Sequence, residues 1–214
     1  MTTQSRKNHV SLKTKQLSLL ALLSALLVVL GLVNIPMPAG LSITFNMIPV
    51  AIAAIVMGVP GGAIMGGVFG LISFLQCFGI LGFSGMGAAL VSVSPLLMFL
   101  QRFASRVLMG VLTALVFRAA SQKTNLFAAC TLTGFASAFF NTLFFMSALL
   151  LFFGKTEYMQ NLMAGRSALA WVVAAVGVNG LVEMAVAALV TGAVGPALKK
   201  ARLFFHVRVP SRST

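Results

Sequence analysis

The sequence predicts an all-α integral membrane protein with six transmembrane helices and both ends of the chain in the cytoplasm. Of its 214 residues, 59% are hydrophobic and only 8% are charged, whereas soluble domains carry about 25% charged residues. Apolar stretches recur along the chain, and most approach the roughly 20 residues that a helix needs to cross a bilayer. We expect an N-terminal cytoplasmic tail over 1–16, one membrane domain over 17–200 and a basic cytoplasmic tail over 201–214.

The net charge of +13 does not indicate a nucleic-acid-binding protein. The basic residues lie between apolar stretches and not on one soluble face. Eleven of the fifteen Lys and Arg residues fall in the two chain ends and the loop after the fourth predicted helix, and two fall in loops on the other side. Because positive charge accumulates on the cytoplasmic side of a membrane, this pattern predicts cytoplasmic termini.

The first apolar stretch, Leu17–Val33, follows basic residues as the core of a signal peptide would. No small-x-small cleavage pattern follows it at Asn34–Ala39, so we interpret it as the first transmembrane helix. A proline-rich break and a short extended or re-entrant segment, Ser42–Asn46, lead to the second helix, Met47–Val59. At about 1.5 Å per residue, that helix spans a bilayer only if its ends extend it, unless it is partly re-entrant.

A Pro-Gly-Gly turn leads to the third helix, Ala63–Phe78. Gly62, Gly66 and Gly70 recur at the four-residue spacing that lets two helices approach closely. The next segment, 79–95, is rich in Gly and Ser and has no charge. It predicts a loop that dips into the membrane or covers a pocket.

Three longer helices complete the predicted domain. They cover Leu96–Phe117, Leu126–Phe153 and about Ala168–Leu198, and the last two are joined by a polar loop, Gly154–Arg166.

Arg102 and Arg106 lie one turn apart on one face of the fourth helix. An arginine at the centre of a spanning helix costs roughly 2.5–3.5 kcal/mol by insertion scales, so the pair needs a partner or a water-filled cavity. Guanidinium groups suit carboxylates and phosphates, which predicts an anion-receiving pocket. Because this helix runs from outside to inside, the pocket should open outward. Gln101 points about 100° away from Arg102 and is not a candidate.

Glu183 is the only acidic residue in a predicted spanning segment, and Asn179 precedes it by one turn. An ionisable group at that depth is a functional candidate, and an arginine is its natural partner. A purely structural Arg–Glu bridge between the fourth and sixth helices is the alternative. The two roles are compatible, because a binding arginine often needs a carboxylate to orient it.

Asn141 offers two donors and an acceptor to a ligand amide or hydroxyl from the fifth helix. A simple interhelical hydrogen bond is the alternative. Asn46 and Gln76 are weaker candidates of the same kind. Tyr158 and Trp171 lie near the outer boundary, where aromatic residues commonly anchor a protein at the membrane interface.

No catalytic, metal or cofactor site is expected. Cys77 and Cys130 lack metal-ligand spacing, and His9 and His206 fall in the tails. The predicted helices hold no nucleophile and base set, so an intramembrane enzyme is disfavoured. A small channel is a further alternative, but channels usually use rings of like residues from several subunits.

The chain resembles the substrate-binding (S) component of energy-coupling factor (ECF) transporters, the bacterial vitamin importers. The similarity covers six helices, the short second helix that begins after Phe45-Asn46, and the run from Gly58 to Leu71. Ala21 and Ala25, at four-residue spacing, are similar to the alanine motif with which these components dock on a transmembrane coupling subunit. The resemblance implies a bacterial cell membrane, a small vitamin as ligand and two cytoplasmic ATPases as partners.

Within that family the chain is most similar to the pantothenate-type branch. The similarity rests on Arg106 and the residues after it, on Asn141-Thr142 and on Asn179-x-x-x-Glu183. The branch usually has proline where this chain has Ser105, and Arg102 is additional. A different vitamin (riboflavin, pyridoxine, folate or a thiamin precursor) is the alternative ligand. The resemblance further implies capture of the vitamin outside the cell, followed by tipping of the component against its coupling subunit.

Overall fold

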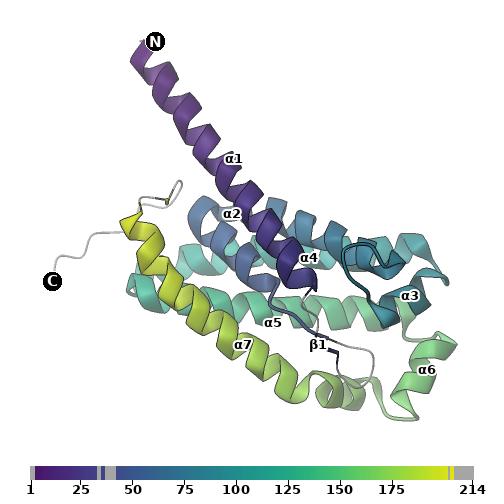
Figure 1. The fold of residues 1–214 in the computed structure, drawn as a ribbon. Coiled ribbons are helices and arrows are strands. Elements are labelled where there is room, and N and C mark those ends of the chain that lie inside the picture. Colours follow the sequence, from purple (N-terminus) through teal and green to yellow (C-terminus); the bar gives the residue numbers. More distant parts are fainter. Residues whose placement is uncertain (1–2, 33–34, 37–41, 202, 205–214) are drawn as a thin grey trace.

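The computed structural model describes residues 3–32, 35–36, 42–201 and 203–204, and it is almost entirely helical (Figure 1). Its elements, in order, are α1 (Thr3–Leu32), β1 (Ile35–Pro36), β2 (Ser42–Ile43), α2 (Met47–Leu75), η2 (Gln76–Phe78), α3 (Gly85–Val91), α4 (Pro95–Lys123), α5 (Leu126–Phe153), α6 (Glu157–Met163) and α7 (Ala168–Lys200). The two short strands pair antiparallel, with Ile35 opposite Ile43. The prediction of a short extended segment before the second helix is therefore confirmed at Ser42–Ile43.

Five of the described helices are long and apolar enough to cross a membrane, which supports the predicted membrane class. By length and composition these spans are Lys13–Leu32, Met47–Phe78, Pro95–Lys123, Leu126–Phe153 and Asn179–Lys200. The count differs from the predicted six because α2 contains both the second and the third predicted helix. α1 begins at Thr3, so it also includes much of the predicted N-terminal tail. The predicted C-terminal tail lies mostly outside the described residues.

α2 turns back on itself at Gly58, near the end of the predicted second helix and two residues before the predicted Pro-Gly-Gly turn. Gly58 has non-helical dihedral angles (φ 67°, ψ −151°), a conformation that only glycine adopts readily, and Pro60 follows. A Cβ built on Gly61 would lie 2.6 Å from the carbonyl oxygen of Ala53, whereas residues eight apart in a straight helix are about 12 Å apart. The arm 47–57 and the arm that follows the turn are therefore antiparallel.

Two segments predicted as loops contain short helices, which corrects those predictions. In the segment 79–95, the Ser84 hydroxyl accepts a hydrogen bond from Gly87 N–H (3.2 Å) and so caps α3. In the segment 154–166, Thr156 caps α6 in the same way through Met159 N–H. Each short helix also buries apolar side chains at helical spacing, such as Met86 with Leu90. Segments this short are poor helices alone and depend on this packing.

The repeated glycines place α2 directly against α4, as their spacing predicts. A Cβ on Gly62 would collide with the carbonyl oxygen of Gly110, and one on Gly110 would collide with Gly62. A Cβ on Gly66 would likewise meet the carbonyl oxygen of Arg106. The backbones of α2 and α4 are therefore in contact, and this contact fixes the position of the arginine pair on α4.

α5 and α7 form the other closely packed pair. A Cβ on Gly134 of α5 would collide with the carbonyl oxygen of Ala187 on α7. Thr191 Oγ1 lies 2.9 Å from the carbonyl oxygen of Cys130 and 2.7 Å from that of Ala187, so its hydroxyl donates to these carbonyls. α7 is interrupted at Gly177 (φ 13°, ψ −117°), between Val176 and Asn179.

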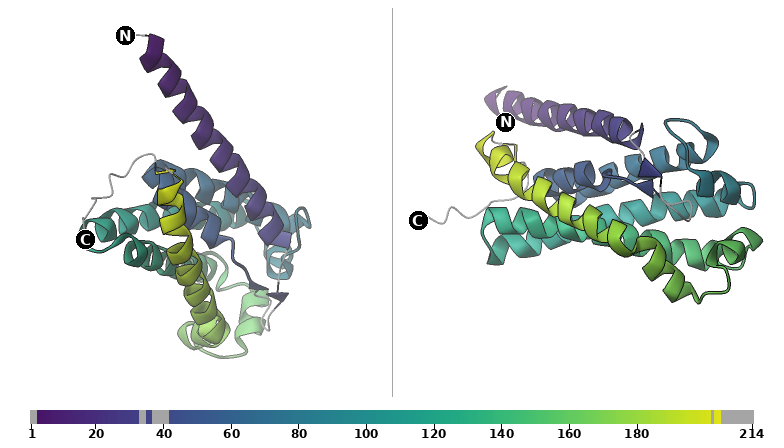
Figure 2. Two further views of the ribbon diagram at one scale, coloured as in Figure 1. Left: turned by 60° about the vertical axis from the view of Figure 1, so that its left-hand side comes forward. Right: turned by 60° about the horizontal axis from the view of Figure 1, so that its bottom comes forward.

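The bundle has two distinct ends. Figures 1 and 2 show the start of α1, the connection between α4 and α5, and the end of α7 at one end, with α3 and α6 at the other. Besides the main apolar core of the bundle, a second apolar cluster packs α3 and α6 against it and includes Met86, Met98, Met159 and Trp171. Trp171 is only 2% exposed, so it packs inside the protein and does not have the predicted role of an interface anchor.

Candidate functional site

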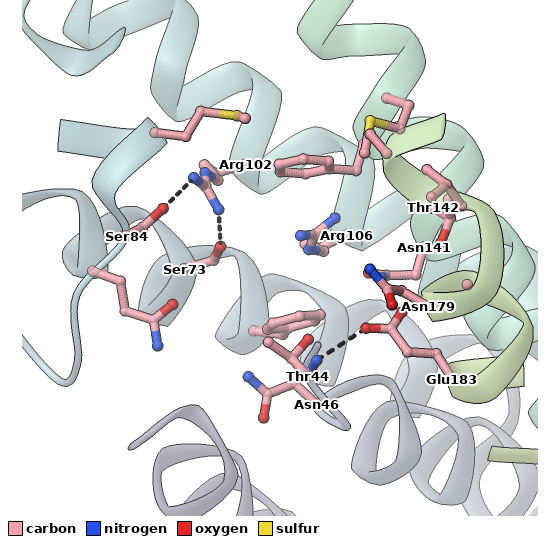
Figure 3. A pocket seen from close by; sticks show the side chains of 18 residues that line it. Thr44, Asn46, Ser73, Ser84, Arg102, Arg106, Asn141, Thr142, Asn179 and Glu183 are labelled. Carbon is pink, nitrogen blue, oxygen red and sulfur yellow. Dashed lines mark hydrogen bonds between the residues drawn. The ribbon is translucent and has the colours of Figure 1, made fainter. Parts of the chain in front are cut away.

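One pocket lies within the bundle at the end that holds α3 and α6 (Figure 3). It contains about 860 Å³ of empty space, including the part open to solvent. Polar side chains and apolar side chains both line it. The lining residues are Thr44, Asn46, Phe69, Ser73, Gln76, Ser84, Met86, Arg102, Arg106, Asn141, Thr142, Phe145, Met146, Ala175, Val176, Asn179, Gly180 and Glu183.

All six residues predicted as substrate contacts line this pocket. They come from the segment before α2 (Asn46), from α4 (Arg102 and Arg106), from α5 (Asn141) and from α7 (Asn179 and Glu183). The reversal of α2 is what brings Asn46, before its first arm, beside residues of its second arm. Gln76, the weaker candidate, also lines the pocket.

Gln101 lies outside the pocket lining, as its position on the helix predicts. Its side chain is fully buried, and its amide nitrogen donates to the carbonyl oxygen of Phe145 (3.3 Å).

Arg106 has unused hydrogen-bonding capacity. Its side chain is 5% exposed, and its Nε and Nη1 atoms are buried with no hydrogen-bond partner. The guanidinium lies over two aromatic rings, 4.7 Å from the centroid of Phe69 and 4.8 Å from that of Phe145. These rings stabilise a cation but accept none of its conventional hydrogen bonds. Arg106 is therefore equipped to receive an anion from the pocket.

Arg102 is held differently. Its Nη1 donates to Ser73 Oγ and its Nη2 donates to Ser84 Oγ, each at 3.0 Å. The guanidinium also lies 5.1 Å from the Phe145 ring centroid. Only its Nε is buried without a partner. Both terminal nitrogens of Arg102 are thus bonded to neighbouring elements of the protein.

Glu183 faces the pocket from the side opposite the arginines (Figure 3). Its Oε1 accepts a hydrogen bond from Thr44 N–H (2.9 Å), which fixes the segment before α2 against α7. Among the described residues, no ion pair joins Arg106 to Glu183. The two groups therefore face the cavity separately, and the structural bridge considered from the sequence is not formed here.

Asn141 and Asn179 lie near Glu183 in the pocket (Figure 3). The Oδ1 atom of Asn141 is buried without a partner, as is that of Asn46. Buried amide oxygens are rarely left unpaired, so these two acceptors are open to a ligand donor. The pocket thus combines cationic donors on one side with neutral and anionic acceptors on the other.

Sequence analysis missed several lining residues. Ser73, Ser84 and Thr44 are small polar residues in apolar or loop segments, where hydroxyl groups are common and carry no distinctive signal. Phe145 could have been found, because it follows Asn141 by four residues and so shares its helix face. The role of the Ser73 and Ser84 hydroxyl groups is evident only from the structure, in which they accept hydrogen bonds from Arg102.

Ala21 and Ala25 lie on the exposed side of α1. The same side carries Leu22 and Leu26, which are exposed, whereas Leu23 and Leu27 are buried against the bundle. The small residues are therefore accessible to lipid or to a partner.

Comparison with known proteins identifies the family. The sequence pattern of the family described as "ECF transporter, substrate-specific component" matches residues 15–195. The chain is also 30% identical over 203 residues to the pantothenic acid transporter PanT of Lactococcus lactis subsp. cremoris (strain MG1363), covering 89% of this chain and 96% of that protein. The chain therefore belongs to the family of substrate-specific components of ECF transporters.

Proposed function

We propose that this S component captures pantothenate outside the cell and delivers it through a coupling subunit and two ATPases. The observation that carries the proposal is the polarity of the pocket. Arg106 presents unpaired donors on one side, and Glu183 and two asparagines present acceptors on the other. The 30% identity to a pantothenic acid transporter supports this ligand over the other vitamins.

The chemistry of pantothenate matches that polarity. Its single carboxylate suits the free Nε and Nη1 of Arg106. Its hydroxyl and amide groups suit Asn141, Asn179 and Glu183. Two arginines and one glutamate give the lining a net charge of +1, which complements a monoanion. Riboflavin would need stacking surfaces, but the two lining phenylalanines already carry guanidinium groups.

We propose that the short first arm of α2 counts as a separate span, which gives six, and that both ends of the chain are cytoplasmic. The charge distribution supports this orientation. Lys13, Lys15, Arg118, Lys123, Lys199 and Lys200 all belong to the end of the bundle opposite the pocket. With that end in the cytoplasm, the pocket opens to the outside. The exposed Ala21 and Ala25 then offer a small-residue surface on α1 for the coupling subunit.

The deciding experiment is calorimetric titration of the detergent-purified protein with pantothenate, riboflavin, pyridoxine, folate and thiamin. Binding of pantothenate alone is the expected result. Binding of a different vitamin would keep the family and discard the ligand. Uptake of labelled pantothenate by cells that also express a coupling subunit and its ATPases tests delivery, with an Ala21→Leu variant as a probe of docking. Retained binding with lost uptake is expected for that variant.

A further inference from the structure

The two arginines of the pocket differ in how the protein uses them. Arg106 has two buried donor nitrogens without a partner, whereas both terminal nitrogens of Arg102 donate to serines of other elements. Ser73 belongs to α2, and Ser84 immediately precedes α3. Arg102, on α4, therefore ties three separate segments together at one wall of the pocket.

Ser84 makes three of the hydrogen bonds at this wall of the pocket. Its hydroxyl accepts from Arg102 Nη2 and from Gly87 N–H, so one oxygen both caps α3 and bonds the guanidinium. Its backbone N–H donates to the carbonyl oxygen of Gln76 (3.0 Å). Ser84 also lines the pocket, together with Met86 in the first turn of α3. The start of α3 is thus a part of the pocket wall whose position depends on Arg102.

The chain before α3 makes a sharp turn. Leu81 and Gly82 have positive φ values of 59° and 114°, and Gly79 has a φ of 78°. α3 packs into the second apolar cluster through Met86, Leu90 and Val91. The hydrogen bond between Ser84 and Arg102 joins the start of α3 to α4.

We propose that Arg102 is a positioning residue that latches the first turn of α3 over the bound ligand, while Arg106 alone receives the ligand anion. This proposal rests on the proposed function of the pocket. The latch makes the rate of ligand release depend on the Arg102–Ser84 hydrogen bond, because the wall must open before the ligand leaves. Ligand entry depends on it as well, because the ligand passes the same wall on its way in.

Gly87 offers a test that leaves every pocket-lining side chain unchanged. A Cβ at Gly87 would lie 2.6 Å from Cys77 Sγ and 2.9 Å from both Arg102 Nη2 and Ser84 Oγ. The Gly87→Ala variant therefore displaces the guanidinium from Ser84, although alanine favours a helix more than glycine does. Gly85→Ala is the matched control, because its Cβ would meet only a Phe83 ring carbon at 3.7 Å.

Release of radiolabelled pantothenate from the purified full-length chain measures the latch. We expect Gly87→Ala to release it about tenfold faster than Gly85→Ala, the factor of about one hydrogen bond to a charged group, with a matching rise in the association rate. Equal release rates for the two variants would overturn the proposal. Faster release with an unchanged or slower association rate would indicate damage to the ligand contacts and would also overturn it.

A second pair of variants and a readout without ligand complete the test. Ser84→Ala removes a helix cap and the latch, whereas Ser94→Ala removes only the cap of α4 through Leu97 N–H. Hydrogen exchange of the amides in 84–88 should accelerate in Gly87→Ala and Ser84→Ala but not in either control. If the wild-type protein does not bind pantothenate, the proposed ligand is wrong. Hydrogen exchange needs no ligand, so unchanged exchange of the amides in 84–88 in Gly87→Ala and Ser84→Ala would refute the latch independently.

Discussion

Replacing Arg106 with methionine should make the empty protein more stable while it abolishes ligand binding. Arg106 is 5% exposed, and its Nε and Nη1 have no partner. Two unpaired buried donors cost about 2–6 kcal/mol at about 1–3 each. The contacts with Phe69 and Phe145 contribute roughly 1–4 kcal/mol in the other direction, at about 0.5–2 each. The difference favours a methionine of similar volume by about 1–2 kcal/mol.

Arg102→Met is the matched control, and the same arithmetic predicts the opposite sign. Arg102 makes two hydrogen bonds at 3.0 Å to Ser73 and Ser84 and leaves only Nε unpaired. Hydrogen bonds to charged groups contribute about 1.5–3 kcal/mol each, which exceeds the cost of the one unpaired donor. Its removal should therefore destabilise the empty protein.

Thermal unfolding of the three proteins in one detergent measures both effects. About 1 kcal/mol corresponds to roughly 2–4 °C for a chain of this size, so Arg106→Met should melt a few degrees above wild type and Arg102→Met below it. Saturating pantothenate should raise the melting temperature of wild type but not of Arg106→Met. If Arg106→Met melts below Arg102→Met without ligand, the inference of an uncompensated charge at Arg106 is wrong.

Three further predictions concern packing and the acceptor side of the pocket. Gly66→Ala should destabilise the protein by about 1–3 kcal/mol, because its Cβ meets the α4 backbone. Gly67→Ala, whose Cβ meets only side-chain atoms at 3.5 Å or more, should melt near wild type. Glu183→Ala should lower the melting temperature by removing the acceptor of Thr44 N–H, whereas Glu183→Gln, which retains an acceptor oxygen, should melt near wild type. Thr191→Val should cost about 1 kcal/mol through the lost α5–α7 hydrogen bond and leave pantothenate affinity unchanged in calorimetry, since it lies outside the pocket lining.

The residues of the candidate site could be predicted because polar and charged side chains cost free energy inside apolar spans and therefore need a partner or a cavity. Arg102, Arg106 and Glu183 are the only charged residues inside the predicted spans, and each needs a cavity or a partner. Asn179 was then predicted because it lies one helical turn before Glu183, on the same face of the helix. The structure brings these residues to one pocket, and their contacts with a ligand remain predictions.

Other features depend on tertiary contacts that local patterns do not reveal. α3 is a seven-residue helix, too short to be favoured by its own composition, and it exists through its cap and the burial of Leu90. The separate roles of the two arginines follow from which serines lie within reach, and Ser73 and Ser84 come from segments with no unusual pattern. A turn was predicted at Pro60-Gly61-Gly62, but the chain reverses at Gly58, inside the predicted second helix, and the close contact between the two arms was not predicted.

That reversal also affects how the sidedness of such a chain is deduced from hydropathy. Counting apolar helices in the described part of the chain finds five candidate spans, an odd number, and an odd number of crossings would separate the two ends of the chain. Because the segment 47–75 leaves and returns toward the same end of the bundle, it adds no net crossing. Four long helices remain, α1, α4, α5 and α7. Because four is an even number, the start of α1 and the end of α7 lie at the same end of the bundle, as Figures 1 and 2 show. The turn at a single glycine with positive φ therefore decides whether the two ends of such a chain are counted on the same side or on opposite sides.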